Sequence, residues 1–237
     1  CGIKIFMGSS TGDLLVDDEK ALERIFSETT GLIAVHAEDE DRLVERYELV
    51  KERTDMAAHA EWRDSDTALI ATKLAVKMAQ KHERRLHVLH LSSALEADWL
   101  VGKTELNNRE GGAWITTETL PQSLTFDQHD VEMLGTRLKM NPPIRYVQDK
   151  NVLWQRIHDG TIQCIATDHA PHSLSAKSEG WPKAPSGMPG VETSLPVMLT
   201  HTVNGKCTIE DVVLWMSTNV AKIYGMKNKG SIAVDAD

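Results

Sequence analysis

Short apolar runs alternate along this chain with longer stretches in which apolar residues recur at helical spacing. The runs predict β-strands over residues 3–7, 32–35, 86–91, 114–118 and 163–167. The periodic stretches predict helices that begin near residues 18, 39, 64, 94 and 149, with two or three more between 193 and 226. Strands that alternate with helices are typical of a parallel sheet with helices packed outside it.

The ends of these elements carry the expected residue types. Three pairs of residues stand where N-cap residues would begin three of the helices: Asp17 and Asp18, Asp64 and Ser65, and Ser92 and Ser93. In the longest helix, Ile70, Leu74 and Met78 are aligned and are expected to face the sheet. Loops are predicted over residues 8–12 and 107–112. Residues 173–189, rich in Ser, Gly, Pro and Lys, are predicted to form a long surface loop.

The number of strands predicts only part of a barrel. An α/β barrel of the TIM type has eight strands, and five are found here. The chain opens at Cys1 directly before an apolar run and stops at Asp237 with no boundary signal. We therefore expect residues 1–237 to be one partial barrel domain, whose N-terminal strands and C-terminal end are missing.

Composition and charge narrow the function classes. The net charge is −9 and no basic cluster is present, so nucleic acid and anionic membranes are poor partners. No apolar run approaches the roughly 18 residues that span a bilayer. The three cysteines are far apart and form no disulfide framework, which suits a reducing compartment such as the cytoplasm.

Polar residues follow three of the predicted strands. His36 ends the second strand, His90 lies in the third, and Asp168 follows the fifth. His87, three residues before His90, is expected to face the opposite side of its strand. Each of these residues alone is more often structural. Together, two imidazoles and a carboxylate at the carboxyl ends of neighbouring strands predict a site for a divalent metal such as Zn²⁺.

Lys4 is an unusual residue for the middle of an apolar strand. Its side chain leaves the strand on the face opposite Ile3 and Ile5, which in a barrel points inward. If Lys4 is buried, its lowered pKa makes the amine a nucleophile that can add CO₂. The resulting carbamate has two oxygens and can bridge two metals. The alternative is a lysine in a salt bridge or simply near the terminus.

The segment from Ala166 to His172, with Lys177 five residues further on, resembles the second signature of the dihydroorotase family. Five further segments occur in the order found in that family, and the resemblance covers nearly the whole chain: Lys4-Ile5-Phe6-Met7, Val35-His36-Ala37-Glu38, His90-Leu91-Ser92-Ser93, Asn141-Pro142-Pro143-Ile144-Arg145 and Gly187-Met188-Pro189-Gly190-Val191-Glu192-Thr193. It is closest to class I bacterial enzymes. The lysine and histidine segments are shared with hydantoinases and dihydropyrimidinases, whereas the Asp-x-Ala-Pro-His and Asn-Pro-Pro segments favour dihydroorotase.

The resemblance implies a site with two zinc ions in a (β/α)₈ barrel of the metal-dependent amidohydrolase kind. By position, Lys4 is the carboxylated lysine that bridges the metals, and His36 and His90 hold one zinc. Asp168 binds the other zinc and serves as the general acid and base.

The same resemblance implies the substrate contacts and shows two departures. Asn141 and His172 match substrate-binding positions, and the segment around Ser186 matches the place where backbone groups hold the ring. The family's first strand carries a His-x-His pair and a nearby arginine, which no predicted strand here carries. Thr117 and Gln122 stand where some relatives have Cys or His, so no third metal is expected.

The implied activity is the reversible zinc-dependent cyclisation of N-carbamoyl-L-aspartate to (S)-dihydroorotate in pyrimidine synthesis. Two alternatives stay open: another cyclic amidase, such as a hydantoinase, dihydropyrimidinase or allantoinase, or a non-catalytic barrel that supports aspartate transcarbamoylase. The implied partners are a small-molecule substrate and either further copies of the chain or aspartate transcarbamoylase. Because the His-x-His pair is not found, this fragment alone is expected to be weak or inactive.

Overall fold

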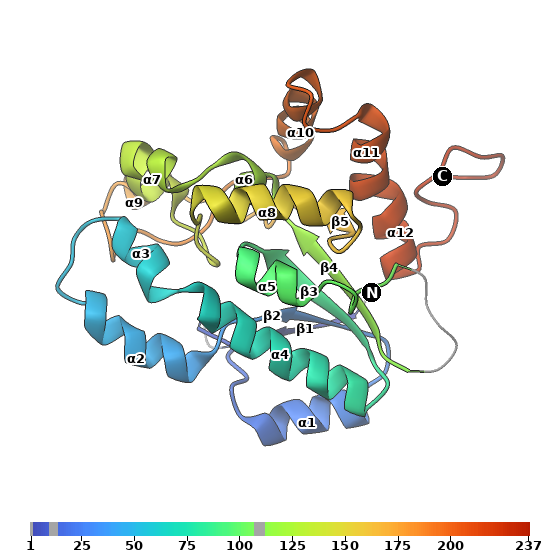
Figure 1. Ribbon diagram of the computed structural model, residues 1–237, viewed down its shortest axis with the longest axis horizontal. Coiled ribbons are helices and arrows are strands. Elements are labelled where there is room, and N and C mark those ends of the chain that lie inside the picture. Colours follow the sequence, from blue (N-terminus) through green and yellow to red (C-terminus); the bar gives the residue numbers. More distant parts are fainter. Residues whose placement is uncertain (1, 10–13, 107–111) are drawn as a thin grey trace.

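The computed structural model describes residues 2–9, 14–106 and 112–237. Five parallel strands form a sheet in the order of the sequence (Figure 1). They are β1 (Gly2–Phe6), β2 (Leu32–His36), β3 (Arg85–Leu91), β4 (Trp114–Thr119) and β5 (Cys164–Ile165). Neighbouring parallel strands joined through helices are the arrangement that the sequence predicts.

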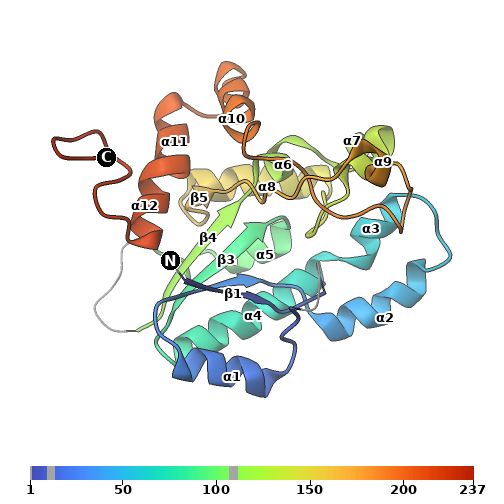
Figure 2. The same ribbon diagram turned by 180° about the vertical axis from the view of Figure 1, so that it is seen from behind.

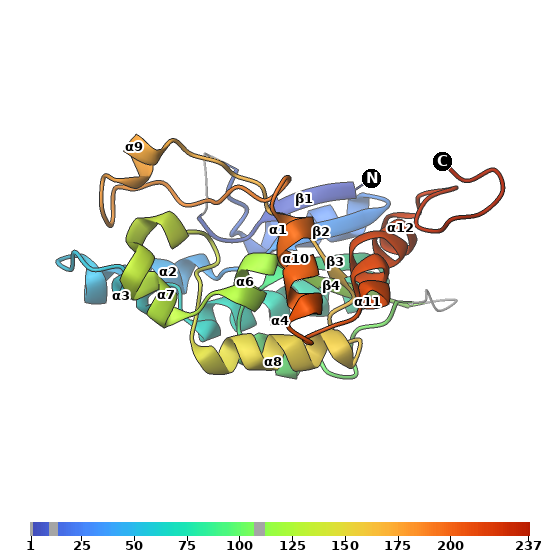
Figure 3. The same ribbon diagram turned by 90° about the horizontal axis from the view of Figure 1, so that it is seen from above.

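Helices connect the strands and cover one face of the sheet. Figures 1 and 2 show α4, α5 and α8 together on that face, and Figure 3 shows α9 on the opposite side. None of the helices formed by the described residues is long and apolar enough to cross a membrane. The helices are α1 (Glu19–Glu28), α2 (Glu40–Val50), α3 (Ala57–Trp62), α4 (Ser65–Lys81), α5 (Ala94–Trp99), α6 (Pro121–Thr125), α7 (Gln128–Leu134), α8 (Val147–His158), α9 (Leu174–Lys177), α10 (Ser194–Val203), α11 (Ile209–Val213) and α12 (Asn219–Tyr224), with a 3₁₀ turn η1 (Gly135–Leu138) and a π-helical turn η2 (Leu214–Thr218).

The predicted helix starts are confirmed at the level of single hydrogen bonds. The side chains of Asp18, Asp64 and Ser93 each accept a hydrogen bond from a backbone N–H in the first turn of α1, α4 and α5. Each cap satisfies a donor that the helix itself leaves without a partner, and such caps stabilise a helix by about 1 kcal/mol.

The face of α4 that packs on the sheet differs from the prediction. Met78 is buried and Leu74 is partly buried, but Ile70 is 43% exposed. The buried row instead contains small residues, including Ala71 and Ala75. Small side chains on the buried face let a helix pack close to a sheet. The helix is therefore rotated so that its alanines, and not Ile70, face the sheet, and the apolar pattern of the sequence does not reveal this.

Other differences concern short elements. Helices α3, α6 and α7 were not predicted, and β5 is shorter than the predicted strand. The segment 173–189 contains α9 and buries Trp181 and Ala184, so the prediction of a surface loop throughout is wrong. Residues 10–12 and 107–111 of the other predicted loops lie outside the described residues.

The register of the sheet separates its two faces. Ile33, Leu86 and Ile115 are aligned on neighbouring strands and pack with the helices in the main apolar core. The next row, formed by Lys4, Ala34, His87 and Thr116, therefore points to the opposite face. We call this the inner face, and α12 contacts it through the ring of Tyr224, 5.7 Å from that of His87.

Glu96 on α5 gives a test of the helical layer. Its carboxylate is 3% exposed, accepts a hydrogen bond from Thr72 Oγ1, and has its pKa raised by burial to about 7. A carboxyl group with a raised native pKa adds stability below its unfolded value, 4.5, and loses that contribution as the pH rises through 7.

We expect Glu96→Gln to be more stable than the parent protein at pH 8, by on the order of 1–3 kcal/mol in the free energy of unfolding. The gap should shrink toward zero at about pH 5, where the native carboxyl is protonated. Urea unfolding at both pH values measures it, and Glu132→Gln, at an exposed position on α7, is the control. A gap that does not change with pH would contradict this account.

Candidate active site

Two of the predicted metal ligands meet at the carboxyl edge of the sheet. His36 ends β2 and His90 lies near the end of β3, and both side chains are buried. His36 Nδ1 lies 3.0 Å from His90 Nε2, so one nitrogen of each ring points at the other ring. The prediction that residues far apart in sequence converge here is consistent with this pair.

An irregularity in β3 brings His90 to this position. The pairing of β3 with β4 shifts register between Val88 and Leu91, and His90 has a φ of +42°. The shift places His90 on the inner face together with His87, so the prediction that these two residues face opposite sides is wrong. Positive φ is strained for a residue with a side chain, and such strain is concentrated at functional sites.

The carboxylate of Glu38 fixes the orientation of the His36 ring. Glu38 Oε2 lies 2.9 Å from His36 Nε2. Burial alone would raise the pKa of Glu38, but Arg63, His36 and Arg145 lower it to about 2, so the group is ionised and can only accept a hydrogen bond. His36 therefore donates from Nε2 to Glu38, and its Nδ1, which faces His90 Nε2, is the nitrogen that would bind a metal, with a carboxylate behind the ligand.

Two buried arginines connect Glu38 to the loops that follow three strands. Arg63 Nη1 donates to Glu38, and its Nη2 donates to Ser9 O, 2.6 Å away, in the loop after β1. Arg145 donates through Nη1 to Arg63 O at 2.6 Å and through Nε to Ser92 Oγ, after β3, at 2.9 Å. The arginines thus hold the edge at which the histidines meet.

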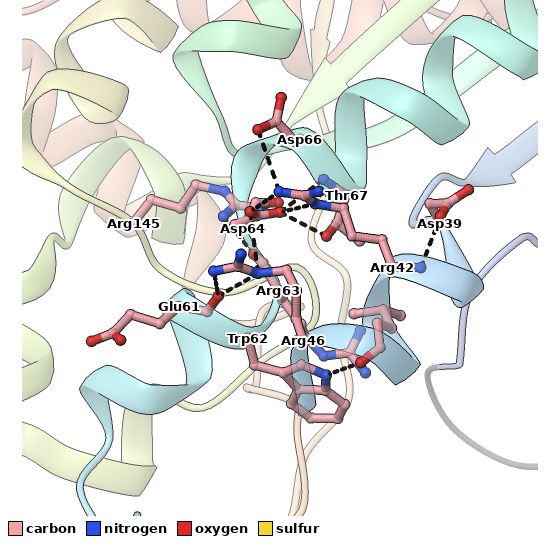
Figure 4. Close-up of polar contacts among 11 residues, drawn as sticks. Asp39, Arg42, Arg46, Glu61, Trp62, Arg63, Asp64, Asp66, Thr67 and Arg145 are labelled. Carbon is pink, nitrogen blue, oxygen red and sulfur yellow. Dashed lines mark hydrogen bonds and ion pairs between the residues drawn. The ribbon is translucent and has the colours of Figure 1, made fainter. Parts of the chain in front are cut away.

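Figure 4 shows how the start of α4 is fixed beside these arginines. Asp64 forms ion pairs with Arg42 at 2.6 Å and with Arg46 at 3.2 Å, and both arginines come from α2. The pKa of Asp64 is lowered to about 2, because these contacts outweigh its partial burial, which acts in the opposite direction. Charge pairs therefore join α2 to α4 next to the Glu38–Arg63 pair.

Asp168 follows β5 at the same edge. Its φ of +43° is strained like that of His90, and the residue is partly buried. Burial raises the pKa of Asp168, while the charges of Lys4 and His36 act to lower it and Glu118 to raise it. Asp168 is thus in electrostatic range of two other predicted ligands, with a carboxyl group whose affinity for a proton is increased.

Lys4 lies on the inner face but is exposed, so the expected burial is wrong for the described structure. Its strand, β1, is the first in the sheet order and has a described neighbour on one side only. The ammonium lies 4.5 Å from the centre of the Phe6 ring, a cation–π contact that keeps the amine beside the edge of the sheet.

The three predicted substrate contacts line one cavity of about 710 Å³. Asn141 is buried, and among the described residues its Oδ1 has no hydrogen-bond partner. His172 Nε2 lies 3.0 Å from Ser186 O and donates to it. The wall includes cationic Arg63 and Lys139 and the aromatic rings of Tyr47 and Trp62. A concave site lined by polar, charged and apolar side chains suits a small ring-shaped ligand that carries polar groups.

The sequence did not reveal two features of this region. Glu38 was quoted as part of a motif, but its partner Arg63 lies 25 residues away, and no local pattern connects them. His87, Glu118 and Cys164 also form a buried group whose ligand atoms lie within 4.8 Å of one another. His87 already contacts Thr116 Oγ1 at 2.8 Å and Glu118 at 3.0 Å, so hydrogen bonds account for that group.

Donor chemistry makes the histidine pair the better metal site. Two facing imidazole nitrogens, with the carboxylate of Asp168 in electrostatic range of His36, match the ligand preferences of Zn²⁺. Among the described residues, His36 and His90 bring two ligand nitrogens together and Asp168 is in electrostatic range of His36, whereas the group of three whose ligand atoms all lie within 4.8 Å of one another is His87, Glu118 and Cys164. Lys4 fits only after carboxylation of its amine.

We expect Glu38→Ala to lower the free energy of unfolding by about 3–5 kcal/mol, because it leaves the Arg63 guanidinium buried without its carboxylate. Because the native pKa of Glu38 is about 2, its contribution should be complete above pH 4.5 and be lost as the pH falls toward 2. Urea unfolding measures both effects. The double variant Glu38→Leu, Arg63→Met should recover most of the loss, and an equal loss in both variants would contradict the pairing.

Comparison with known proteins places the chain in a family. The model of the amidohydrolase family matches residues 28–237. The chain is 34% identical over 237 residues to a dihydroorotase from Halobacterium salinarum, covering 99% of this chain and 53% of that protein. It is also 34% identical over 241 residues to an allantoinase from Streptomyces avermitilis, covering 100% of this chain and 52% of that protein.

Solved structures give the same result for the fold. The L-hydantoinase from Arthrobacter aurescens matches with a TM-score of 0.89 and 29% identity, over 99% of this chain and 53% of that one. The chain spans about half the length of the curated relatives it matches. The predicted α/β fold of the amidohydrolase barrel kind is thereby confirmed. The chain belongs to the amidohydrolase family.

Proposed function

We propose that the protein containing this chain is a dihydroorotase that interconverts N-carbamoyl-L-aspartate and (S)-dihydroorotate. The observation that carries the proposal is the position of the paired imidazoles of His36 and His90, with Asp168 in electrostatic range of His36, at the strand edge where α/β barrels hold their active sites. Several relatives of about this similarity are named dihydroorotase.

In this proposal His36 and His90 would hold one zinc ion, Asp168 would hold a second, and Lys4, once its amine has added CO₂ and lost a proton, would bridge them. When bound, the metals would lower the pKa of a shared water and polarise the carbonyl of the ring amide. Asp168 takes the proton of the attacking water and returns it to the departing nitrogen, and the reverse reaction uses the same group.

The cavity contains the residues that are proposed to bind the substrate. Asn141, whose buried Oδ1 has no partner among the residues that the structure describes, can accept a hydrogen bond from a ring N–H, and the backbone around Ser186 can hold the ring.

A second candidate is another cyclic amidase, such as a hydantoinase or an allantoinase. It is favoured by the apolar part of the same wall, formed by Leu43, Tyr47 and Trp62, and by the named relatives of those activities. Assays with dihydroorotate, hydantoin and allantoin separate the two candidates.

The remaining parts of the proposal rest on the resemblance. We propose that residues 1–237 are one part of a metal-dependent barrel domain whose further zinc ligands, a His-x-His pair, lie upstream. We also propose a cytoplasmic location and association with further copies or with aspartate transcarbamoylase.

For Asp168→Asn we expect turnover of dihydroorotate to fall by about 10³-fold or more, because the amide cannot carry the proton. The thermal midpoint should stay close to that of the parent. Steady-state assays in both directions measure the loss, with Asp159→Asn, in a turn outside the site, as the control. Substantial residual activity would remove Asp168 from the mechanism.

For Lys4→Ala we expect loss of bound zinc and of activity, with partial recovery of both in short carboxylic acids that replace the carbamate. Metal analysis of the purified variant, with and without acetate, measures this independently of turnover. Full zinc content without the lysine would contradict the bridging role.

A further inference from the structure

Lys177, at the end of α9, is a buried lysine that binds backbone carbonyl groups. Its Nζ donates to Lys139 O at 2.8 Å and to Pro185 O and Gly187 O at 3.0 Å each. These three bonds use all the donors of one ammonium group. Within the described ranges, no carboxylate forms an ion pair with it.

A second lysine completes the arrangement. Lys139 Nζ donates to Pro182 O at 2.7 Å and to Ala184 O, and Gly187 N donates to Lys139 O at 2.9 Å. Two neighbouring ammonium groups therefore bind four carbonyls of the segment 182–187. We call this pair and that segment the lysine clamp.

The clamped segment is a wall of the candidate site. Residues 182–186 line the same cavity as Asn141 and His172. Ser186 O accepts from His172, and the backbone of Gly187 approaches Ala170 so closely that a Cβ there would lie 2.4 Å from Ala170 O. The segment thus rests directly on the loop that follows Asp168.

Burying an ammonium group in this wall costs free energy, so the group must be compensated by specific contacts. Burial, together with the neighbouring Lys139 ammonium, lowers the pKa of Lys177 to about 8. A buried charge is tolerated only where fixed dipoles replace water, and the carbonyls do so in one geometry. An apolar side chain could fill the same space but could not fix the direction of three carbonyls.

We propose that Lys177 is a positioning residue that fixes the backbone of residues 185–187 against His172 and so sets the affinity for substrate rather than the rate of the chemical step. The part of this inference that concerns substrate rests on the proposed function. The part that concerns the segment does not.

The first test is kinetic. Lys177→Met keeps the length of the side chain and removes the ammonium, and it should raise KM for dihydroorotate roughly tenfold while kcat changes by less than about threefold. Lys206→Met, at an exposed lysine away from the cavity, is the matched control and should change neither. An unchanged KM, or an equal loss in kcat with KM unchanged, would overturn the positioning role.

The second test needs no substrate. Lys183 is exposed within the clamped segment, so trypsin can cut after it once the segment loosens. Mass spectrometry should show cleavage at Lys183 roughly tenfold faster in Lys177→Met than in Lys206→Met, with other sites unaffected. Equal cleavage rates would overturn the clamp even if the kinetic proposal about dihydroorotate were correct.

A third variant keeps both tests decisive if Lys177→Met does not fold. Lys177→Arg retains the charge, but its planar guanidinium does not match three carbonyls that converge on one point. It should fold and show intermediate values of KM and of cleavage at Lys183. Values equal to those of the parent would overturn the proposal, and a complete protein that is inactive on every cyclic amide would reject the proposed function and leave the cleavage test standing.

Discussion

The direction of the strands is the constraint on which this structure depends. Parallel strands joined through helices all end at one edge of the sheet, so the residue that follows each strand meets those that follow its neighbours. Phe6 pairs with His36 across β1 and β2, and the irregular end of β3 moves His90 toward the same point. The backbone hydrogen bonds of the sheet thus bring reactive side chains from distant segments of the chain to one place.

Buried charge makes that edge rigid. The Glu38–Arg63 pair lies behind His36, and Arg145 joins Arg63 to the loop after β3. Removing one member of such a network leaves an uncompensated charge, whereas the complete network is close to neutral in stability. The network contributes by fixing geometry, because a histidine ligand whose second ring nitrogen is hydrogen-bonded to a carboxylate keeps one tautomer and one orientation. The lysine clamp fixes a wall of the cavity in a similar way, except that its charged groups bind backbone carbonyl oxygens and not a carboxylate.

Much of the fold could be predicted from the sequence, because strands and capped helices leave local patterns. The strand that ends in His36 and the helix capped by Asp64 are examples. The errors have a common origin in tertiary structure. A register shift moved His90 to the face of His87, and close packing of alanines turned Ile70 outward. Neither effect changes the apolar pattern.

The candidate site shows the same limit. Asn141, His172 and Ser186 were predicted as separate contacts and line one cavity, but the partners that orient the site were not foreseen. Arg63 reaches Glu38 across 25 residues, and Lys177 binds carbonyl oxygens that every residue possesses. Sequence patterns reveal the reactive side chains of a site, but they give little information on the residues that orient those side chains.

The central claim is that His36 and His90 share one metal ion. Anomalous diffraction at the zinc absorption edge, from crystals of the zinc-loaded protein, tests it directly. The account predicts a peak about 2.1 Å from both His36 Nδ1 and His90 Nε2. A protein whose zinc lies on His87, Glu118 and Cys164, or away from both imidazoles of the pair, would contradict it.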